Sequence, residues 1–179
     1  AFYNNNLTSI HIPSNVKTIG LAAFEKNDLT SVYLSEGVER IENRAFRDNY
    51  LTTIHLPKSI NHVAATVFYN NKLTNVYVEN ANTNFNNQAF DGTQTNPADL
   101  TIWGHDPSTA KTLAENKGYT FRILSDHYSD YTWVELTPDT VEITGYNGLS
   151  LQVDIPNLIE DKTVTRIGNH AFLNKGIEK

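Results

Sequence analysis

The sequence predicts an α/β solenoid whose coils of about 22 residues stack around one parallel β-sheet. Three columns of identical residues, each with an interval of 22 residues, lead to this fold. The columns are Phe2, Phe24, Phe46, Phe68 and Phe90; Leu7, Leu29, Leu51 and Leu73; and Asn5, Asn27, Asn49 and Asn71. A fixed interval of this kind indicates repeated units that each bury an apolar side on their neighbours.

The first part of each coil has the pattern of a half-buried strand. Apolar and polar residues alternate toward Leu34 in the segment 29–34, which is rich in β-branched and aromatic side chains. Pro13 and Pro57 directly follow two such segments, where a missing N–H ends a ladder at little cost. We therefore expect five parallel strands that form a single concave sheet. They lie near residues 9–12, 31–34, 53–56, 75–78 and 99–103.

The second part of each coil has apolar residues at spacings of three, four and one, as from Val38 to Phe46. These spacings favour one or two short helical turns on the side opposite the strand. The asparagine column follows these turns, and its side chains can bond backbone groups between coils. We expect Phe24, Phe46 and Phe68 to stack as a buried column.

The period breaks after the fifth phenylalanine, and residues 100–102 recover the strand pattern two residues late. Ser108 is a candidate N-cap for a helix that Gly118 ends, and residues 119–124 have a strand pattern. A helix and a strand outside the repeat suit a cap, because the last coil leaves an apolar end open. We predict a capped repeat array over residues 1–124.

The remainder of the chain predicts a junction and a second array. Residues 125–140 form the junction, and residues 141–179 start the second array, with a hairpin that turns on Asn147-Gly148. The repeat register then returns at Val164, Ile167-Gly168 and Ala171-Phe172. The chain has no Met and starts inside a repeat, at Ala1-Phe2, so we expect a fragment of a longer protein. Its two ends carry the same repeat position, Ala1-Phe2 and Ala171-Phe172, so the end of one molecule could pair with the start of the next. We therefore also expect head-to-tail self-association.

The repeat resembles the bacterial BspA-like leucine-rich repeat, also called the Treponema pallidum class. That class reads approximately Leu-Thr-Ser-Val-x-Ile-Pro, followed by Val-x-x-Ile-Gly-x-x-Ala-Phe. Matching residues here are Leu7 to Pro13, Val16, Ile19-Gly20 and Ala23-Phe24. The resemblance covers residues 1 to about 124, and again 141–179. It implies a right-handed leucine-rich repeat solenoid in an extracellular or bacterial cell-surface protein.

Composition and motifs argue against catalysis and against several classes of partner. The chain has no Cys, no nucleophile elbow, no P-loop and no metalloprotease helix, and its six His residues lack metal-ligand spacing. Asp91 and Asp99 lie in a long loop, at a spacing that does not fit a calcium site. A net charge of −6 disfavours nucleic acid, and no apolar run approaches the ~18 residues of a membrane span. We expect no enzyme activity, no cofactor, no metal, no nucleic acid and no membrane insertion.

The strand segments predict an exposed aromatic face. Residues that flank the buried pair of each strand point outward, and adjacent strands lie about 4.8 Å apart. The expected columns are Ser9, Ser31, Thr53, Asn75 and Asp99; His11, Tyr33, His55, Tyr77 and Thr101; and Pro13, Ser35, Pro57, Glu79 and Trp103. Exposed aromatic rows are typical of recognition surfaces. We predict ligand binding by His11, Tyr33, His55, Tyr77 and Trp103; the alternative is cross-strand pairing that only stabilises the sheet.

Three functions are compatible with this sequence. The first is a non-enzymatic recognition scaffold of a bacterial cell-surface or secreted protein, which binds a protein or glycan ligand on a host or microbial surface, as in adhesion. The second is a structural stalk or spacer that presents another domain. The third is a glycan-targeting accessory module of an enzyme, based on the Tyr and His column and Trp103.

Overall fold

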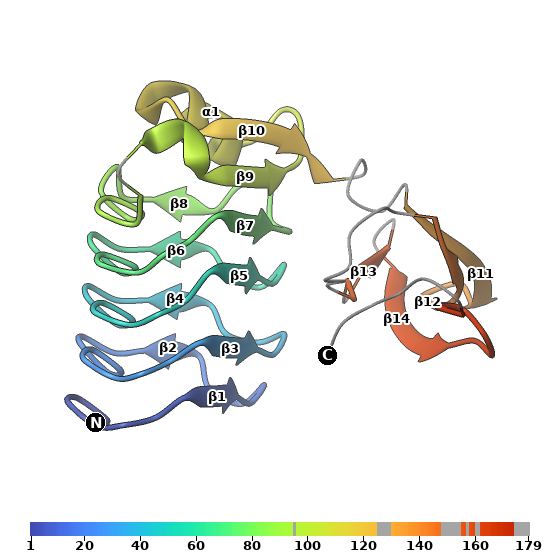
Figure 1. Cartoon of the computed structure of the whole chain (residues 1–179), viewed down its shortest axis with the longest axis horizontal. Coiled ribbons are helices and arrows are strands. Elements are labelled where there is room, and N and C mark those ends of the chain that lie inside the picture. The colour runs from blue at the N-terminus through green and yellow to red at the C-terminus, as the bar shows by residue number, and fades with distance from the viewer. Residues whose placement is uncertain (95, 125–129, 148–154, 157, 160–161, 174–179) are drawn as a thin grey trace. The chain divides into compact units, whose positions relative to one another are not determined.

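Figure 1 shows the computed structural model of the chain, which describes residues 1–94, 96–124, 130–147, 155–156, 158–159 and 162–173. The chain divides into two compact units, Ala1–Leu124 and Ser125–Lys179. The first unit is a stack of coils, and each of the first four contributes a longer strand to one side and a shorter strand to another (Figure 1). This stack is a parallel-strand solenoid, as the repeat interval predicts.

The longer strands form at the predicted places. They are β1 (Ser9–Ile12), β3 (Ser31–Leu34), β5 (Thr53–Leu56), β7 (Asn75–Val78) and β9 (Thr101–Gly104). A sixth strand, β10 (Thr120–Ile123), pairs with β9, and all the pairings among these strands are parallel. The predicted parallel strands are thus confirmed, the last of them with a later start.

The prediction of a single sheet is wrong, because these strands form two sheets, β1-β3 and β10-β9-β7-β5. Pro57 gives a physical reason for the interruption between β3 and β5. Ser35 and Glu79 hold the corresponding position after β3 and β7, and each donates its N–H to the preceding coil, at 3.0 and 3.1 Å. Proline has no N–H to donate. The two coils remain joined elsewhere, for example by the N–H of Tyr50 and the carbonyl of Leu29 at 2.9 Å.

The predicted helical turns are also wrong, since short strands take their place. These strands are β2 (Thr18–Ile19), β4 (Arg40–Ile41), β6 (His62–Val63) and β8 (Asn84–Phe85), and they form a second parallel sheet. In the turns that follow, Ala22, Arg44 and Thr66 have φ values of 51°, 60° and 54°. The N–H of Ala22 bonds the next coil, at the carbonyl of Asn43. Within the turn, single bonds such as that from the N–H of Ala23 to the carbonyl of Gly20 remain, but the left-handed residues interrupt the continuous series of hydrogen bonds that a helix requires.

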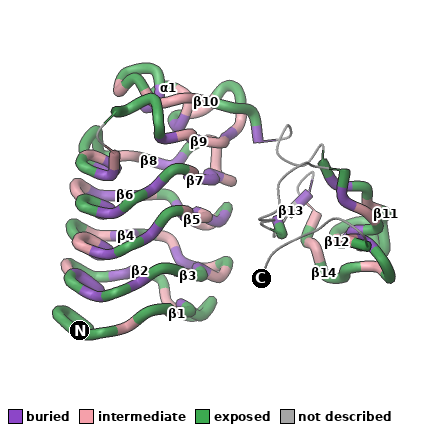
Figure 2. Tube along the Cα trace, viewed as in Figure 1, coloured by how far each residue is buried: buried purple, intermediate pink, exposed green. Residues whose placement is uncertain are grey.

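The phenylalanine column forms the predicted stack through the core of the first unit. Phe24 is 5% exposed, and Phe46 and Phe68 are fully buried. Neighbouring rings from Phe2 to Phe90 lie 5.3–5.9 Å apart with planes within 4–6° of parallel. Figure 2 shows that buried residues continue from coil to coil along the stack.

The asparagine column satisfies buried backbone groups, as predicted. Asn49 is 4% exposed, and its Oδ1 accepts the N–H of Leu29 at 3.0 Å. Its Nδ2 donates to the carbonyls of Phe24 at 2.9 Å and Phe46 at 3.1 Å, so one side chain joins two coils. Asn27 and Asn71 repeat these bonds. The column is therefore a structural element of the stack.

The cap follows the sequence signals closely. Helix α1 (Thr109–Lys117) begins after Ser108, whose Oγ accepts the N–H of Lys111 at 3.1 Å, and it ends at Gly118 with φ of 73°. Thr109 bonds the carbonyl of Thr83 in the preceding coil through its hydroxyl at 2.7 Å. Ala110, Leu113 and Ala114 form the buried face of α1. The helix and β10 thus cover the last coil.

Tyr119, in the cap, gives a prediction about alkaline stability. Its hydroxyl donates to Asp91 Oδ1 at 3.4 Å, and burial, with the nearby Asp91 carboxylate, raises the pKa of the phenol. The folded state favours the protonated phenol, so Tyr119 contributes to the free energy of unfolding. This stabilisation is complete below the unfolded pKa of about 10, and it is lost as the pH rises through the folded pKa. We expect the stability of the wild type to fall more steeply above pH ~10 than that of Tyr119→Phe. Urea unfolding at several pH values compares them; a difference between the two proteins that does not change with pH would contradict this role.

The second unit contains one described four-stranded sheet. Its strands are β11 (Tyr131–Thr137), β12 (Thr140–Tyr146), β13 (Leu158–Ile159) and β14 (Lys162–Ile167), in the order β11-β12-β14-β13. The predicted hairpin that turns on Asn147-Gly148 stays a prediction, because residues 148–154, which include most of its second strand (149–155), lie outside the described residues. Among the described strands, β12 pairs antiparallel with the preceding strand β11. β11 itself falls within the segment assigned to a junction.

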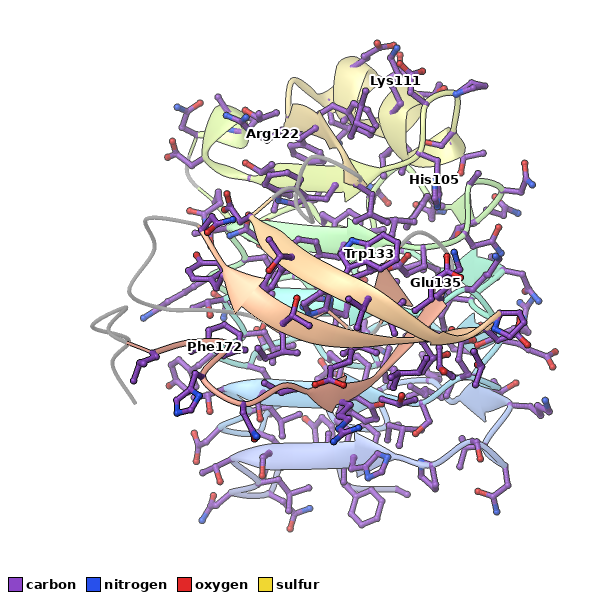
Figure 3. All side chains as sticks on the ribbon, turned by 90° about the vertical axis from the view of Figure 1, so that its right-hand side faces the viewer. His105, Lys111, Arg122, Trp133, Glu135 and Phe172 are labelled. Carbon is purple, nitrogen blue, oxygen red and sulfur yellow. The ribbon has the colours of Figure 1, made fainter. Side chains whose placement is uncertain are left out.

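The turn before Phe172 in the second unit has the local geometry of the repeat turns. β12 and β14 are parallel, with Val141 aligned to Val164. His170 has φ of 64°, and the N–H of Ala171 bonds the carbonyl of Gly168, as in the repeat turns of the first unit. The Phe172 ring lies 5.7 Å from that of Tyr146. On β11, Trp133 and Glu135 lie along the strand (Figure 3), and Lys162 pairs with Glu135 at 2.7 Å.

Candidate binding face

The outward side of the longer strands carries the predicted aromatic column. The parallel register aligns His11 with Tyr33, His55 with Tyr77, and Tyr77 with Trp103. In-register parallel strands bring equivalent side chains to neighbouring positions. The five residues predicted to bind a ligand therefore all belong to one column.

Trp103 lies in this aromatic column because the register of β9 against β7 differs by two residues from the predicted register. Asn75 aligns with Thr101 rather than with Asp99, and Tyr77 aligns with Trp103 rather than with Thr101. The reason is the 3-10 turn η1 (Pro97–Asp99), which includes Asp99 and delays the start of β9. Trp103 thus joins the histidines and tyrosines, and leaves the column of Pro13 and Glu79 to which the sequence pattern assigned it.

The column consists of two aromatic clusters. In the first cluster, the His11 and Tyr33 rings lie 4.8 Å apart in an edge arrangement, and His11 Nε2 lies 2.8 Å from Ser35 Oγ. Both rings of this pair are exposed, Tyr33 at 49%. The break between β3 and β5 lies between this cluster and the next one. The first cluster therefore offers the more accessible aromatic surface.

In the second cluster, the rings are stacked on one another. The His55 and Tyr77 rings lie 4.3 Å apart, and the Tyr77 and Trp103 rings lie 5.9 Å apart, with interplanar angles of 13° and 17°. Trp103 also donates Nε1–H to Asn75 Oδ1 at 3.0 Å. His55 and Trp103 are half-buried, whereas Tyr77 is only 5% exposed.

The burial of Tyr77 changes what its truncation would do. Sequence reasoning treats it as an exposed ring whose replacement by alanine leaves thermal stability nearly unchanged. Its ring lies between those of His55 and Trp103, so the replacement removes buried aromatic packing and is expected to destabilise the fold. Tyr33 is the better probe of binding.

Sequence reasoning missed one residue of this face, Arg122. β10 aligns Arg122 with Trp103, and the guanidinium carbon lies 5.7 Å from the Trp103 ring centroid. Figure 3 shows Arg122 in the cap. The signal in the sequence is the strand pattern of residues 119–124, which places Arg122 on a strand beside β9. Arginine over an indole face makes a cation–π contact and adds a positive group to the end of the column.

The His11 and Ser35 pair and the acidic side chains are relevant to nucleophilic catalysis and to metal binding, respectively. A serine and histidine pair becomes nucleophilic when a third group orients the imidazole, and in the described part of the chain no carboxylate bonds His11. No group of three or more described His, Asp or Glu residues could hold a metal ion. Asp91, considered for calcium, forms an ion pair with Lys117 at 2.6 Å. Among the described helices, none is long and apolar enough to cross a membrane.

Comparison with known protein families identifies the repeat array. The family model described as BspA type leucine rich repeat region, in 6 copies, matches residues 1–101. Comparisons with curated proteins and with solved structures find no match. The matched residues cover more than half of the chain and contain every coil from β1 to β8. The chain therefore belongs to the BspA-type leucine-rich repeat family.

Proposed function

We propose that this protein is a non-enzymatic recognition scaffold of a bacterial cell-surface or secreted protein. Its ligand is a protein or glycan on a host or microbial surface, bound by the outward side of the longer strands. The observation that supports this proposal best is the aromatic column, which presents an exposed His11 and Tyr33 pair beside the stack that ends at Arg122. The family supports the scaffold role, because leucine-rich repeat solenoids serve as interaction scaffolds.

The chemistry of the column suits recognition. Tyrosine offers contact area and a hydroxyl at a low entropic cost, and arginine and aromatic residues are enriched where binding energy concentrates. His11 is held against Ser35, and Trp103 against Asn75, so the rings keep fixed orientations before a ligand arrives. A surface ordered in advance loses less entropy on binding.

A structural spacer is the second candidate, and the burial of Tyr77 favours it. A ring that is 5% exposed and stacked on both sides stabilises the sheet through cross-strand contacts without any ligand. The recognition scaffold and the spacer differ in the role of the exposed His11 and Tyr33 pair. A scaffold uses Tyr33 to contact a ligand, whereas a spacer does not require an accessible tyrosine at this position.

The binding test compares two tyrosines of nearly equal exposure. Tyr33, on the proposed face, is 49% exposed, and Tyr50, in a loop, is 51% exposed. The wild type is screened against arrays of purified extracellular proteins and of glycans, and the affinity for each captured ligand is then measured for Tyr33→Ala and Tyr50→Ala. We expect Tyr33→Ala to bind roughly tenfold to thirtyfold more weakly and Tyr50→Ala to bind like the wild type.

Circular dichroism of both variants serves as the control for folding. Equal binding by the wild type and Tyr33→Ala would remove the aromatic column as the binding face. Absence of any ligand for the wild type on both arrays would favour the spacer.

A further inference from the structure

A cleft separate from the aromatic column lies between β8 and α1, where the cap meets the last repeat. Its volume is about 490 Å³, within the size range of small-molecule sites. It exists because the fifth coil places α1 where the earlier coils place a short strand, so β8 is the edge strand of the sheet β2-β4-β6-β8. A helix does not reproduce the ladder of hydrogen bonds that another strand would form with β8.

The edge of β8 leaves a backbone acceptor at the cleft. In the preceding coils, the carbonyl of Ile41 accepts the N–H of Ala64 at 3.0 Å, and the carbonyl of Val63 accepts the N–H of Asn86 at 2.8 Å. Phe85 is the next residue in this series, so its carbonyl points to the side where the next coil would lie. In the described part of the chain no N–H is bonded to it. Such an acceptor requires water or a ligand donor.

The polar lining of the cleft consists of three threonines and three asparagines. The hydroxyls of Thr83, Thr109 and Thr112 bond backbone carbonyls of the protein. The side-chain amides of Asn84, Asn87 and Asn116 make no hydrogen bond among the described residues, so they are the polar groups that the cleft offers to a ligand. Each amide offers two donors and an acceptor. Phe85 and Leu113 add a ring and an aliphatic side chain to the lining.

None of the described residues that line the cleft is charged. An ionic ligand would lose its hydration in the cleft and find no opposite charge there, which is costly. A purely apolar ligand would bury the amides without forming hydrogen bonds to them. The lining instead matches a ligand that carries many hydroxyl groups and an apolar face. A sugar ring has both, since its hydroxyls can pair with the amides while its C–H face lies on Phe85.

We infer that the cleft between β8 and α1 is a binding site for a neutral saccharide. The inference does not depend on the proposed function, because the cleft shares no residue with the aromatic column of His11, Tyr33, His55, Tyr77, Trp103 and Arg122.

The test is a titration of the whole isotope-labelled chain, followed by the backbone amide resonances. The probes are maltotriose, cellotriose and triacetylchitotriose, with a heparin-derived oligosaccharide as the charged counterpart. We expect at least one neutral trisaccharide to shift the resonances of Asn84, Phe85 and Asn116, while the charged probe leaves them in place.

A double variant tests whether the amides make the contacts. Asn87→Ala with Asn116→Ala removes two exposed amides that have no partner in the described residues, and alanine favours the helix at the second position. We expect it to bind the neutral trisaccharide at least roughly tenfold more weakly. The matched control is Asn6→Ala with Asn15→Ala, which removes two exposed amides in the first coil and is expected to bind like the wild type.

Three results would overturn the inference. The first is no shift at the cleft with any of the three neutral probes, the second is a shift that the double variant retains in full, and the third is an equal response to the charged probe. If the first result came with shifts at His11 and Tyr33, it would support the proposed function, so the two proposals fail separately. A thermal melt of each variant confirms that the fold is intact.

Discussion

Replacing Phe46 with alanine is expected to lower the free energy of unfolding of the first unit by roughly 3–5 kcal/mol. The Phe46 ring is fully buried and stacks on Phe24 at 5.5 Å and on Phe68 at 5.9 Å. Truncation removes contacts with both neighbouring coils and leaves a cavity that a rigid stack fills poorly, because each coil is held in place by the next.

Urea unfolding followed by circular dichroism measures this loss, and Phe2→Ala is the matched control. Phe2 belongs to the same column, is 48% exposed and stacks on one ring, Phe24. We expect the control to lose less than about 1.5 kcal/mol, since little apolar surface returns to water. A loss for Phe46→Ala no larger than that for Phe2→Ala would show that the column does not carry the stability of the stack.

Replacing Asn49 with alanine is expected to cost roughly 3 kcal/mol, although the side chain is small and polar. Its amide accepts the N–H of Leu29 and donates to the carbonyls of Phe24, Phe46 and Arg47. At this position, where the amide is 4% exposed, alanine leaves the N–H of Leu29 without its acceptor. The carbonyls of Phe24 and Phe46 each lose one of two donors, because Asn27 and Asn71 also bond them. A buried N–H that loses its partner costs about 1–3 kcal/mol, and each further lost hydrogen bond costs roughly 0.5–1.5 kcal/mol.

The control for this second prediction comes from the same column. Asn5 is exposed, and its amide donates to the carbonyl of Tyr3 at 3.3 Å. We expect Asn5→Ala to change stability by less than about 0.5 kcal/mol, as for other surface substitutions. Hydrogen exchange at the N–H of Leu29 provides a local measurement, because this proton loses its acceptor in Asn49→Ala. Unchanged protection of that proton would mean that the amide bond is dispensable.

Thr93 shows how the column ends at the cap. It lies 22 residues after Asn71, is 5% exposed, and its hydroxyl donates to the carbonyl of Phe90 at 2.9 Å. The Thr93 hydroxyl thus makes the same bond within its own coil that Asn71 makes to the carbonyl of Phe68. Gln94 then bonds the previous coil, through Nε2 to the carbonyl of Leu73. Two residues thus bond their own coil and the previous coil, as one asparagine does in the interior of the stack, although Gln94 bonds a carbonyl of the previous coil where Asn71 accepts the N–H of Leu51.

The candidate face was predictable wherever the interval of 22 residues holds. His11, Tyr33, His55 and Tyr77 follow this interval, so their alignment in one column could be predicted from their positions alone. Trp103 was assigned to the wrong column, because the sequence does not reveal how many residues the turn η1 takes up before β9. Arg122 was missed because β10 joins the sheet through the cap, outside the repeat.

The sequence by itself determined the stack of coils, the phenylalanine core, the asparagine column and the ends of α1. Each of these depends on a local pattern or on contacts between neighbouring coils that the interval repeats. The tertiary structure alone decided the short second sheet, the break at Pro57, the burial of Tyr77 and the cleft beside β8. These features depend on which backbone groups find partners in the adjacent coil, and hydrogen bonds between coils outweigh the weak helical preference of a few residues.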